Sequence, residues 1–215
     1  MKCLNQLGDH SNLKPQPKRN EKHPALANGG KKTEVSSTND MMDYGDRQEP
    51  LCHKTMPVVL VLDRLRSAFN TGNIFRLADA VRAQSVITCG YTPSPPHAKL
   101  AKTARGTEQI VHSETAESSA AAVQDLKHKG LTVYAVEITE KAQSIWDTTI
   151  KFPAAFVLGN EALGVTPDVL TLCDEAIALP CLGVKHSINV GNCAAVVLYE
   201  ALRQWQGRLF PDDGV

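Results

Sequence analysis

Short apolar segments alternate with helix-like segments along most of this chain, and that alternation restricts its fold more than any other feature. Runs of apolar residues cover positions 57–62, 86–89, 131–136, 154–158 and 176–179. Their near-continuous apolar character is typical of strands that are buried on both faces. Such strands belong to parallel sheets, so the sequence predicts an α/β fold whose parallel sheet is covered by helices on both faces.

Helical patterns occupy the intervals between these strands. Apolar residues recur at helix spacing over 74–81, and a second helix is expected over 120–129, where Gly130 stops it. Residues 92–106 are rich in Pro and Lys and predict a loop, and residues 109–112 predict a short strand. The last helix carries one apolar stripe, formed by Val190, Ala194, Val197, Leu198, Ala201, Leu202 and Trp205.

Residues 1–52 differ from the rest, because they are polar, rich in Pro and Gly in places, and without an apolar period. Such a segment buries too little surface to offset the entropy of ordering. We therefore predict a flexible polar tail over 1–52 and one folded domain over 53–215. The first 40 residues hold seven Lys and Arg against four Asp and Glu, so an arm that touches RNA is the alternative to a solvated tail.

The charges balance over the whole chain, with 23 Lys and Arg against 23 Asp and Glu. Any contact with nucleic acid therefore requires a local basic patch. No apolar run is long enough for a membrane span, and the first 30 residues lack the apolar core of a signal peptide. The six Cys form no CxxC pair, so we expect reduced thiols in a cytoplasmic protein without a metal site.

Three segments carry polar residues next to predicted strands, and the first is Asn70-Thr-Gly-Asn-Ile-Phe-Arg76. Ligands of open parallel sheets gather at the carboxyl ends of strands, where this segment begins. Each residue also has a purely structural interpretation. Asn70 is suited to cap the helix, Gly72 to ease its entry, and Arg76 to pair with Asp79 on the surface.

The second segment, Phe156-Val-Leu-Gly-Asn-Glu-Ala-Leu-Gly164, runs from a buried strand into a glycine-containing turn. Glycine lets a ligand approach the backbone closely. The segment matches neither the GxGxxG fingerprint of dinucleotide sites nor a P-loop. Taken alone, it fits a plain turn as well as a ligand loop.

The third segment is Ala178-Leu-Pro-Cys-Leu-Gly-Val-Lys-His-Ser-Ile-Asn-Val190, which leads into the last helix. Ser187 and Asn189 are both suited to cap that helix. His186 beside Ser187 is reminiscent of a hydrolase, but the Gly-x-Ser-x-Gly elbow is absent, so we reject that interpretation.

In this order and spacing, the three segments resemble the SpoU (TrmH-like) branch of the SPOUT methyltransferases, over about residues 55–207. The matching patterns are Asn70-x-Gly-x-x-x-Arg76, Leu158-Gly-Asn-Glu-x-x-Gly164 and Leu179-Pro-x-x-Gly-x-x-x-Ser-Ile-Asn-Val190. The chain departs from the usual residues at Cys181, Ile188 and Gly191, and none of these departures removes a polar group that the chemistry uses.

The resemblance implies a deep trefoil knot in the C-terminal part of the sheet, and a homodimer with the active site at its interface. It implies transfer of a methyl group from S-adenosylmethionine to a ribose 2′-hydroxyl of tRNA, with rRNA as the alternative. A catalytically silent RNA-binding member is a rival, against which the intact polar residues argue. A doubly wound nucleotide-binding enzyme is a second rival, against which the missing Gly-rich fingerprint argues.

The resemblance also assigns roles to residues. Arg76 activates or stabilises the ribose oxygen while Asn70 holds Arg76 in place, and Ser187 and Asn189 position the ribose. No metal is implied, because the sulfonium supplies the electrophile. The implied S-adenosylmethionine contacts are Gly159, Leu179, Ile188, Leu158, Glu137, Asn160 and Glu161. The residues expected to meet RNA phosphates are Arg64, Arg66, Lys99, Lys102 and Arg105, for which a solvated charged loop is the alternative.

Overall fold

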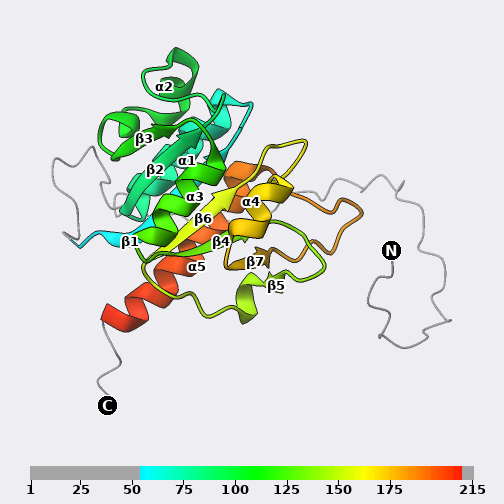
Figure 1. Cartoon of the computed structure of the whole chain (residues 1–215). Helices are drawn as coiled ribbons and strands as arrows, with labels where there is room; N and C mark the ends of the chain where they lie inside the picture. The colour runs from blue at the N-terminus through cyan, green and yellow to red at the C-terminus, as the bar shows by residue number, and fades with distance from the viewer. Residues whose placement is uncertain (1–53, 210–215) are drawn as a thin grey trace, which may run out of the picture. The chain divides into compact units, whose positions relative to one another are not determined.

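A computed structural model of the protein describes residues 54–209, with side chains through residue 206. The predicted polar tail, residues 1–52, lies outside the described residues. Seven strands form one sheet in the order β3-β2-β1-β6-β4-β7-β5, with every neighbouring pair parallel (Figure 1). The strands are β1 Met56–Asp63, β2 Ala83–Cys89, β3 Ser113–Ala116, β4 Thr132–Val136, β5 Gln143–Ser144, β6 Ala154–Leu158 and β7 Glu175–Ala178.

Helices cover both faces of this sheet, as the continuous apolar strands predict. The α-helices are α1 Ala68–Ala80, α2 Ala98–Ala104, α3 Ser119–His128, α4 Pro167–Leu172 and α5 Val190–Leu209, with short 3-10 turns η1 Thr107–Gln109 and η2 Ile145–Asp147. In β1, Leu60 and Leu62 belong to the core beneath α1 and α5, whereas Val59 and Val61 belong to the core beneath α3 and α4. The predicted fold class is therefore confirmed at the level of a parallel α/β sheet.

The centre of the larger core lies beneath the last helix. Tyr134 of β4 and Phe156 of β6 are register partners, and their rings stack with centroids 5.6 Å apart. The stripe predicted for the last helix faces this core. Its central residues Ala194, Val197, Leu198 and Ala201 are buried, and the flanking residues Val190, Leu202 and Trp205 pack against the same cluster.

Two predictions between β2 and α3 are wrong. The segment expected to be a loop contains α2, whose cap is the His97 side chain directly after the last proline. Leu100 and Ala104, one turn apart, are buried and anchor this helix. The strand expected over 109–112 instead begins at Ser113, because β3 is a polar edge strand that carries no apolar pattern. The short elements β5, η2 and α4 were not predicted.

Gly72 allows α1 and α2 to pack closely. A Cβ built on Gly72 would collide with the Thr103 hydroxyl and with the Leu100 carbonyl oxygen of α2. The Leu100 carbonyl is backbone and cannot rotate away. The motif glycine therefore holds a helix contact and does not merely ease a turn.

We expect Gly72→Ala to lower the free energy of unfolding by ~1–3 kcal/mol, the usual cost of overpacking. Denaturant unfolding of the purified variant measures this. Adding Thr103→Ala should recover only part of the loss, because the Leu100 carbonyl remains in place. An unchanged unfolding midpoint for Gly72→Ala would contradict the close helix contact.

The strand order brings the second and third segments together. Strands β6, β4 and β7 are neighbours, and because they are parallel their carboxyl ends meet at one edge of the sheet. The loops after these strands are 159–166, 137–142 and 179–189.

Among residues 54–209, no helix has the length and apolar character needed to span a membrane.

Candidate active site

A cavity of about 660 Å³ lies at the carboxyl ends of β4, β6 and β7. That volume suits a nucleoside-sized ligand. All seven residues expected to contact a methyl donor line it, namely Glu137, Leu158, Gly159, Asn160, Glu161, Leu179 and Ile188. Ser187 and Asn189 also line it, whereas Asn70 and Arg76 do not. Residues for which no binding role was predicted complete the wall, including Ile138, Leu163, Cys181, His186 and Cys193.

Two glycines shape the loop that follows β6. A Cβ on Gly159 would collide with the backbone of Gly164 and Val165. Gly164 has a φ of +69°, and a Cβ there would collide with the Glu137 carboxylate. The loop thus folds back tightly on itself and against β4, which only glycine permits at these positions.

Glu137 fixes the other end of this loop. Its Oε2 accepts a 2.9 Å hydrogen bond from the Val165 N–H, and its Oε1 accepts a 3.0 Å bond from the Ile138 N–H. The carboxylate therefore joins the end of β4 to the end of the β6 loop while it lines the cavity.

Asn160 organises the same loop from within. Its Oδ1 accepts from the N–H groups of Ala162 and Leu163, at 2.9 and 3.1 Å. Its Nδ2 donates to the Arg64 carbonyl at 2.7 Å and to the Tyr91 hydroxyl at 2.9 Å. The protein thus occupies all four hydrogen-bonding positions of this amide. The Asn160 side chain therefore contributes to the shape of the cavity and has no free polar group for a ligand.

One chain of hydrogen bonds joins all three segments. Asn70 Nδ2 donates to Glu161 Oε1 at 2.9 Å, and Asn189 Nδ2 donates to Asn70 Oδ1 at 3.1 Å. Glu161 also accepts from the N–H groups of Arg66 and Ser67, at 2.8 and 3.1 Å. Asn189 Oδ1 accepts from the N–H groups of Gly191 and Asn192, so it also caps α5. The suggested helix cap at Asn189 is therefore present.

The suggested helix cap at Asn70 is wrong. The cap is Ser67, whose hydroxyl accepts from the Asn70 N–H at 3.2 Å. Within one chain the Asn70 amide is bonded to Glu161 and Asn189, so a contact with Arg76 stays a prediction for the interface between two copies. Positions six residues apart lie on different sides of a helix. Asn70 instead connects the three segments.

These bonds set the acid–base behaviour of Glu161. Partial burial acts to raise the pKa of Glu161, but hydrogen bonds from the Arg66 N–H, the Asn70 amide and the Ser67 N–H lower it overall. A lowered folded-state pKa means that Glu161 stabilises the fold above its unfolded pKa of ~4.3. That stabilisation is lost as the pH falls through the lower folded-state value.

We expect Asn70→Asp to lower the free energy of unfolding at pH 7 by ~1 kcal/mol, because it places two carboxylates in contact. Asn70→Ala removes the donor to Glu161 without adding charge, and also the acceptor for Asn189, and serves as the control. The difference between the two variants should shrink below pH 4, where one carboxylate becomes protonated. A difference that does not depend on pH in thermal unfolding would contradict the contact with Glu161.

Arg76 is exposed on α1. Within residues 54–209 its guanidinium forms no ion pair, and the suggested surface pair with Asp79 is absent. No stabilising partner within the described chain therefore accounts for this residue.

The five cations expected to meet RNA lie after β1 and in or next to α2. Arg66, Lys99, Lys102 and Arg105 are exposed. Arg64 is only partly exposed, and its Nε donates to Asp63 Oδ1 at 3.1 Å. Arg64 is therefore less available to a phosphate than the other four.

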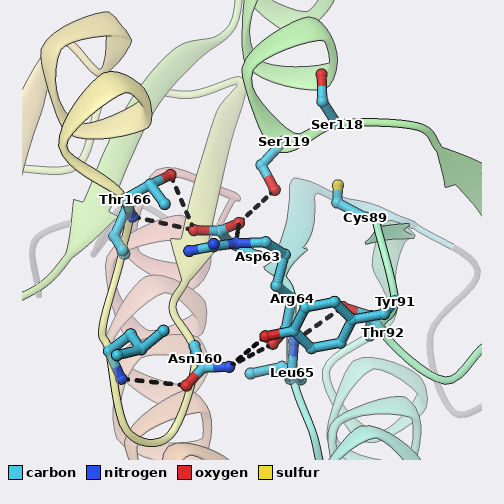
Figure 2. A network of polar contacts seen from close by, with 12 residues as sticks. Asp63, Arg64, Leu65, Cys89, Tyr91, Thr92, Ser118, Ser119, Asn160 and Thr166 are labelled. Carbon is cyan, nitrogen blue, oxygen red and sulfur yellow. Dashed lines mark hydrogen bonds and ion pairs between the residues drawn. The ribbon is translucent and has the colours of Figure 1, made fainter.

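Asp63 was not identified from the sequence, although it ties several loops together (Figure 2). It is 1% exposed, and its carboxylate accepts from the Ser119 hydroxyl at 2.6 Å and from the Thr166 N–H at 3.1 Å. A buried carboxylate needs such donors. Asp63 thus fixes the start of α3 and the end of the β6 loop to β1.

Burial keeps the thiol of Cys193, which lines the cavity, protonated at neutral pH. The four described cysteines, Cys89, Cys173, Cys181 and Cys193, are free. Burial raises the pKa of Cys193 and of Cys89 to about 11, and that of Cys173 to about 12. A protonated thiol is a poor nucleophile, so Cys193 contributes an apolar wall.

Within the described residues, no group of three or more His, Cys, Asp or Glu is placed to hold a metal ion.

Comparison with known proteins shows to which family the chain belongs. The sequence profile of the SpoU rRNA Methylase family matches residues 57–199, which include all three segments. The chain belongs to this family. The resemblance inferred from the three motifs is therefore confirmed.

Individual members of the SpoU family show how close this relationship is. The tRNA (guanosine(18)-2'-O)-methyltransferase of Thermus thermophilus is 32% identical over 160 residues, covering 73% of this chain and 80% of that protein. The 23S rRNA (guanosine-2'-O-)-methyltransferase RlmB of Ralstonia nicotianae is 31% identical over 148 residues, covering 69% and 59%. A solved structure, the SpoU methyltransferase AviRb from Streptomyces viridochromogenes in complex with AdoMet, shares the fold, with a TM-score of 0.66, 24% identity and coverage of 72% and 62%.

Proposed function

We propose that this chain is an RNA ribose 2′-O-methyltransferase that uses S-adenosylmethionine and acts on tRNA. The observation that carries the proposal is the hydrogen-bond chain Glu161–Asn70–Asn189, which joins all three family motifs beside one cavity. A tRNA substrate is favoured because the tRNA-modifying relative matches over 80% of its own length, against 59% for the rRNA-modifying one. The proposed catalytic domain spans residues 53–215.

The cavity fits S-adenosylmethionine chemically. Leu158, Leu179 and Ile188 supply apolar walls for a flat adenine, and the tight turn at Gly159 presents backbone groups. Glu137 places a carboxylate in the same wall, which suits a ligand with cationic groups. When bound, S-adenosylmethionine supplies a methyl group activated by a sulfonium.

The residues of the chain then have to act on the RNA hydroxyl. The ribose hydroxyl passes its proton to water while its oxygen bonds to the methyl carbon and the bond from that carbon to sulfur breaks. Negative charge develops on the oxygen because proton loss runs ahead of formation of the new bond. Arg76 stabilises this charge, directly or through an adjoining phosphate, which is easier than removing a proton with a guanidinium. Ser187 and Asn189 orient the ribose at the mouth of the cavity.

The proposal includes a C-terminal trefoil knot and a homodimer, as in the family resemblance. Support for the homodimer comes from the separation of Arg76 from the cavity within one chain. Further support comes from apolar side chains that one chain leaves exposed, including Leu182 at 98%, Val184 at 93% and Tyr199 at 53%. Burial of such side chains between two copies would stabilise a dimer.

We expect light scattering at micromolar concentration to give a mass of about twice the 23.3 kDa of one chain. Introducing charge with Tyr199→Glu should shift the protein toward the monomer. A wild-type mass of one chain at this concentration would contradict the dimer.

The test of the proposed function uses methyl-labelled S-adenosylmethionine with unfractionated tRNA and, separately, with rRNA. Label is expected in a 2′-O-methyl nucleoside of tRNA, recognised because the adjoining phosphodiester resists alkali. Label in rRNA alone would show that the substrate is rRNA, the alternative to tRNA. Label on a base, or no label with either RNA, would overturn the proposed reaction.

A further inference from the structure

Tyr91 combines a hydrogen-bonded hydroxyl with a side chain that is largely exposed. It lies two residues after the end of β2 and reaches across the end of β1 to the loop after β6, where its hydroxyl accepts a 2.9 Å hydrogen bond from Asn160 Nδ2 (Figure 2). Asn160 is 4% exposed, whereas Tyr91 is 58% exposed. The oxygen is therefore anchored to a buried residue while much of the aromatic ring faces solvent.

The backbone beneath this ring is held firmly. Thr92 Oγ1 donates to the Leu62 carbonyl at 3.0 Å and accepts from the Leu65 N–H at 2.9 Å. Gly90 has a φ of +58°, and a Cβ there would lie 3.2 Å from Cγ of Arg64. Arg64 itself has a φ of +55°, a conformation that costs energy in a residue other than glycine. The ring is thus presented from a segment whose conformation is fixed on several sides.

Tyr91 lies between the two parts of the proposed site. On one side, Asn160 opens the loop that lines the cavity. On the other side, the chain continues from Tyr91 into α2, which carries the exposed cations Lys99 and Lys102. Tyr91 is therefore an exposed aromatic side chain that contacts a residue of the cavity wall and belongs to the segment leading into the basic helix α2.

We propose that Tyr91 stacks on an unpaired RNA base at or next to the methylated nucleotide. This inference rests on the proposed function and adds the substrate class: RNA whose target region is single-stranded. Aromatic side chains in RNA-binding sites stack on bases that have left the helix, whereas bases inside a duplex are not accessible. Because the ring is already fixed, little conformational entropy is lost on stacking.

Direct binding tests the inference with a fluorescently labelled 12-nucleotide single-stranded RNA and a duplex of the same sequence. Tyr91→Leu should weaken binding of the single strand by about 5- to 100-fold, the scale of one lost stacking contact, and leave duplex binding unchanged. Tyr91→Phe keeps the ring and loses only the anchored oxygen, so its affinity should stay within about threefold of the wild type. Trp146→Leu is the matched control, because Trp146 is 56% exposed but follows β5 at the other edge of the sheet.

A second measurement needs no variant. Ultraviolet irradiation of the wild type with unfractionated tRNA should yield a nucleotide adduct on the peptide that contains Tyr91. Adducts found only on other peptides would overturn the inference, as would wild-type affinity for the single strand in Tyr91→Leu. Failure of the wild type to bind either RNA would also overturn it.

Calorimetry with S-adenosylhomocysteine separates this inference from the proposed function. If Tyr91 only holds Asn160 in position, Tyr91→Phe and Tyr91→Leu should weaken S-adenosylhomocysteine binding equally and leave RNA affinity unchanged. That result would show that the stacking role is wrong. If the proposed function fails, the wild type itself does not bind S-adenosylhomocysteine, while the RNA comparison between variants still gives an answer.

Discussion

Replacing Arg76 with alanine is expected to reduce methyl transfer to tRNA by at least ~100-fold, the scale of losing one well-placed charge stabiliser. The melting temperature and S-adenosylhomocysteine binding should not change. Arg76 is exposed and forms no ion pair within the described chain, and it does not line the cavity. The substitution therefore removes no contact that holds the fold or the cavity together.

Two further variants sharpen the Arg76 test. Arg76→Lys should also be poor, because a point charge does not reproduce the planar, bidentate guanidinium. Asp79→Ala is the control for a surface role, since a surface pair would contribute only a few tenths of a kcal/mol and no catalysis. Full activity in Arg76→Ala would remove Arg76 from the mechanism even if the cofactor site proved right.

Replacing Gly159 with valine is expected to abolish S-adenosylhomocysteine binding in calorimetry, with at least ~100-fold lower affinity. The side chain would not simply fill the space of the ligand, because its Cβ points into the backbone of Gly164 and Val165. The loop after β6 would have to move, and with it the cavity wall that this loop provides. We also expect ~1–3 kcal/mol lower stability from overpacking.

Gly183→Ala provides the matched control for Gly159→Val. Gly183 lies in the loop after β7, and a Cβ there would meet nothing within 4 Å. This variant should bind S-adenosylhomocysteine like the wild type. Normal affinity in Gly159→Val would show that the tight turn does not form the binding wall.

The fold could be predicted where burial left a pattern in the sequence. Strand β6 has the predicted bounds, because every one of its residues is buried and therefore apolar. Strand β3 and the two-residue β5 are largely exposed, so their residues are polar and resemble those of loops. Helix α2 was hidden by the prolines before it, since its cap, His97, is not a usual capping residue.

The site was predictable to a different extent. The seven cavity contacts were implied by the family resemblance, and they lie together because they follow strands that end at one edge of the sheet. The partners of Asn70 were not predictable in this way. Its bonds to Glu161 and Asn189 span 91 and 119 positions, and no local pattern specifies such pairs. The same holds for Asp63. In the sequence it is only the polar residue at the end of a strand, and its hydrogen-bond donors, Ser119 and Thr166, lie far away along the chain.

The sheet order has a consequence for how this protein matures on the ribosome. Strand β6 lies between β1 and β4, although about 90 residues separate β1 from β6 in the chain. Until β6 emerges, one side of β1 has no strand to pair with, and an apolar strand edge of this kind invites association with other chains. The hydrogen-bond chain Glu161–Asn70–Asn189 is completed later still, once Asn189 has been synthesised. A nascent chain halted before β6 therefore exposes one edge of β1, its longest strand, so a chaperone that shields apolar strand edges would act at this stage of synthesis.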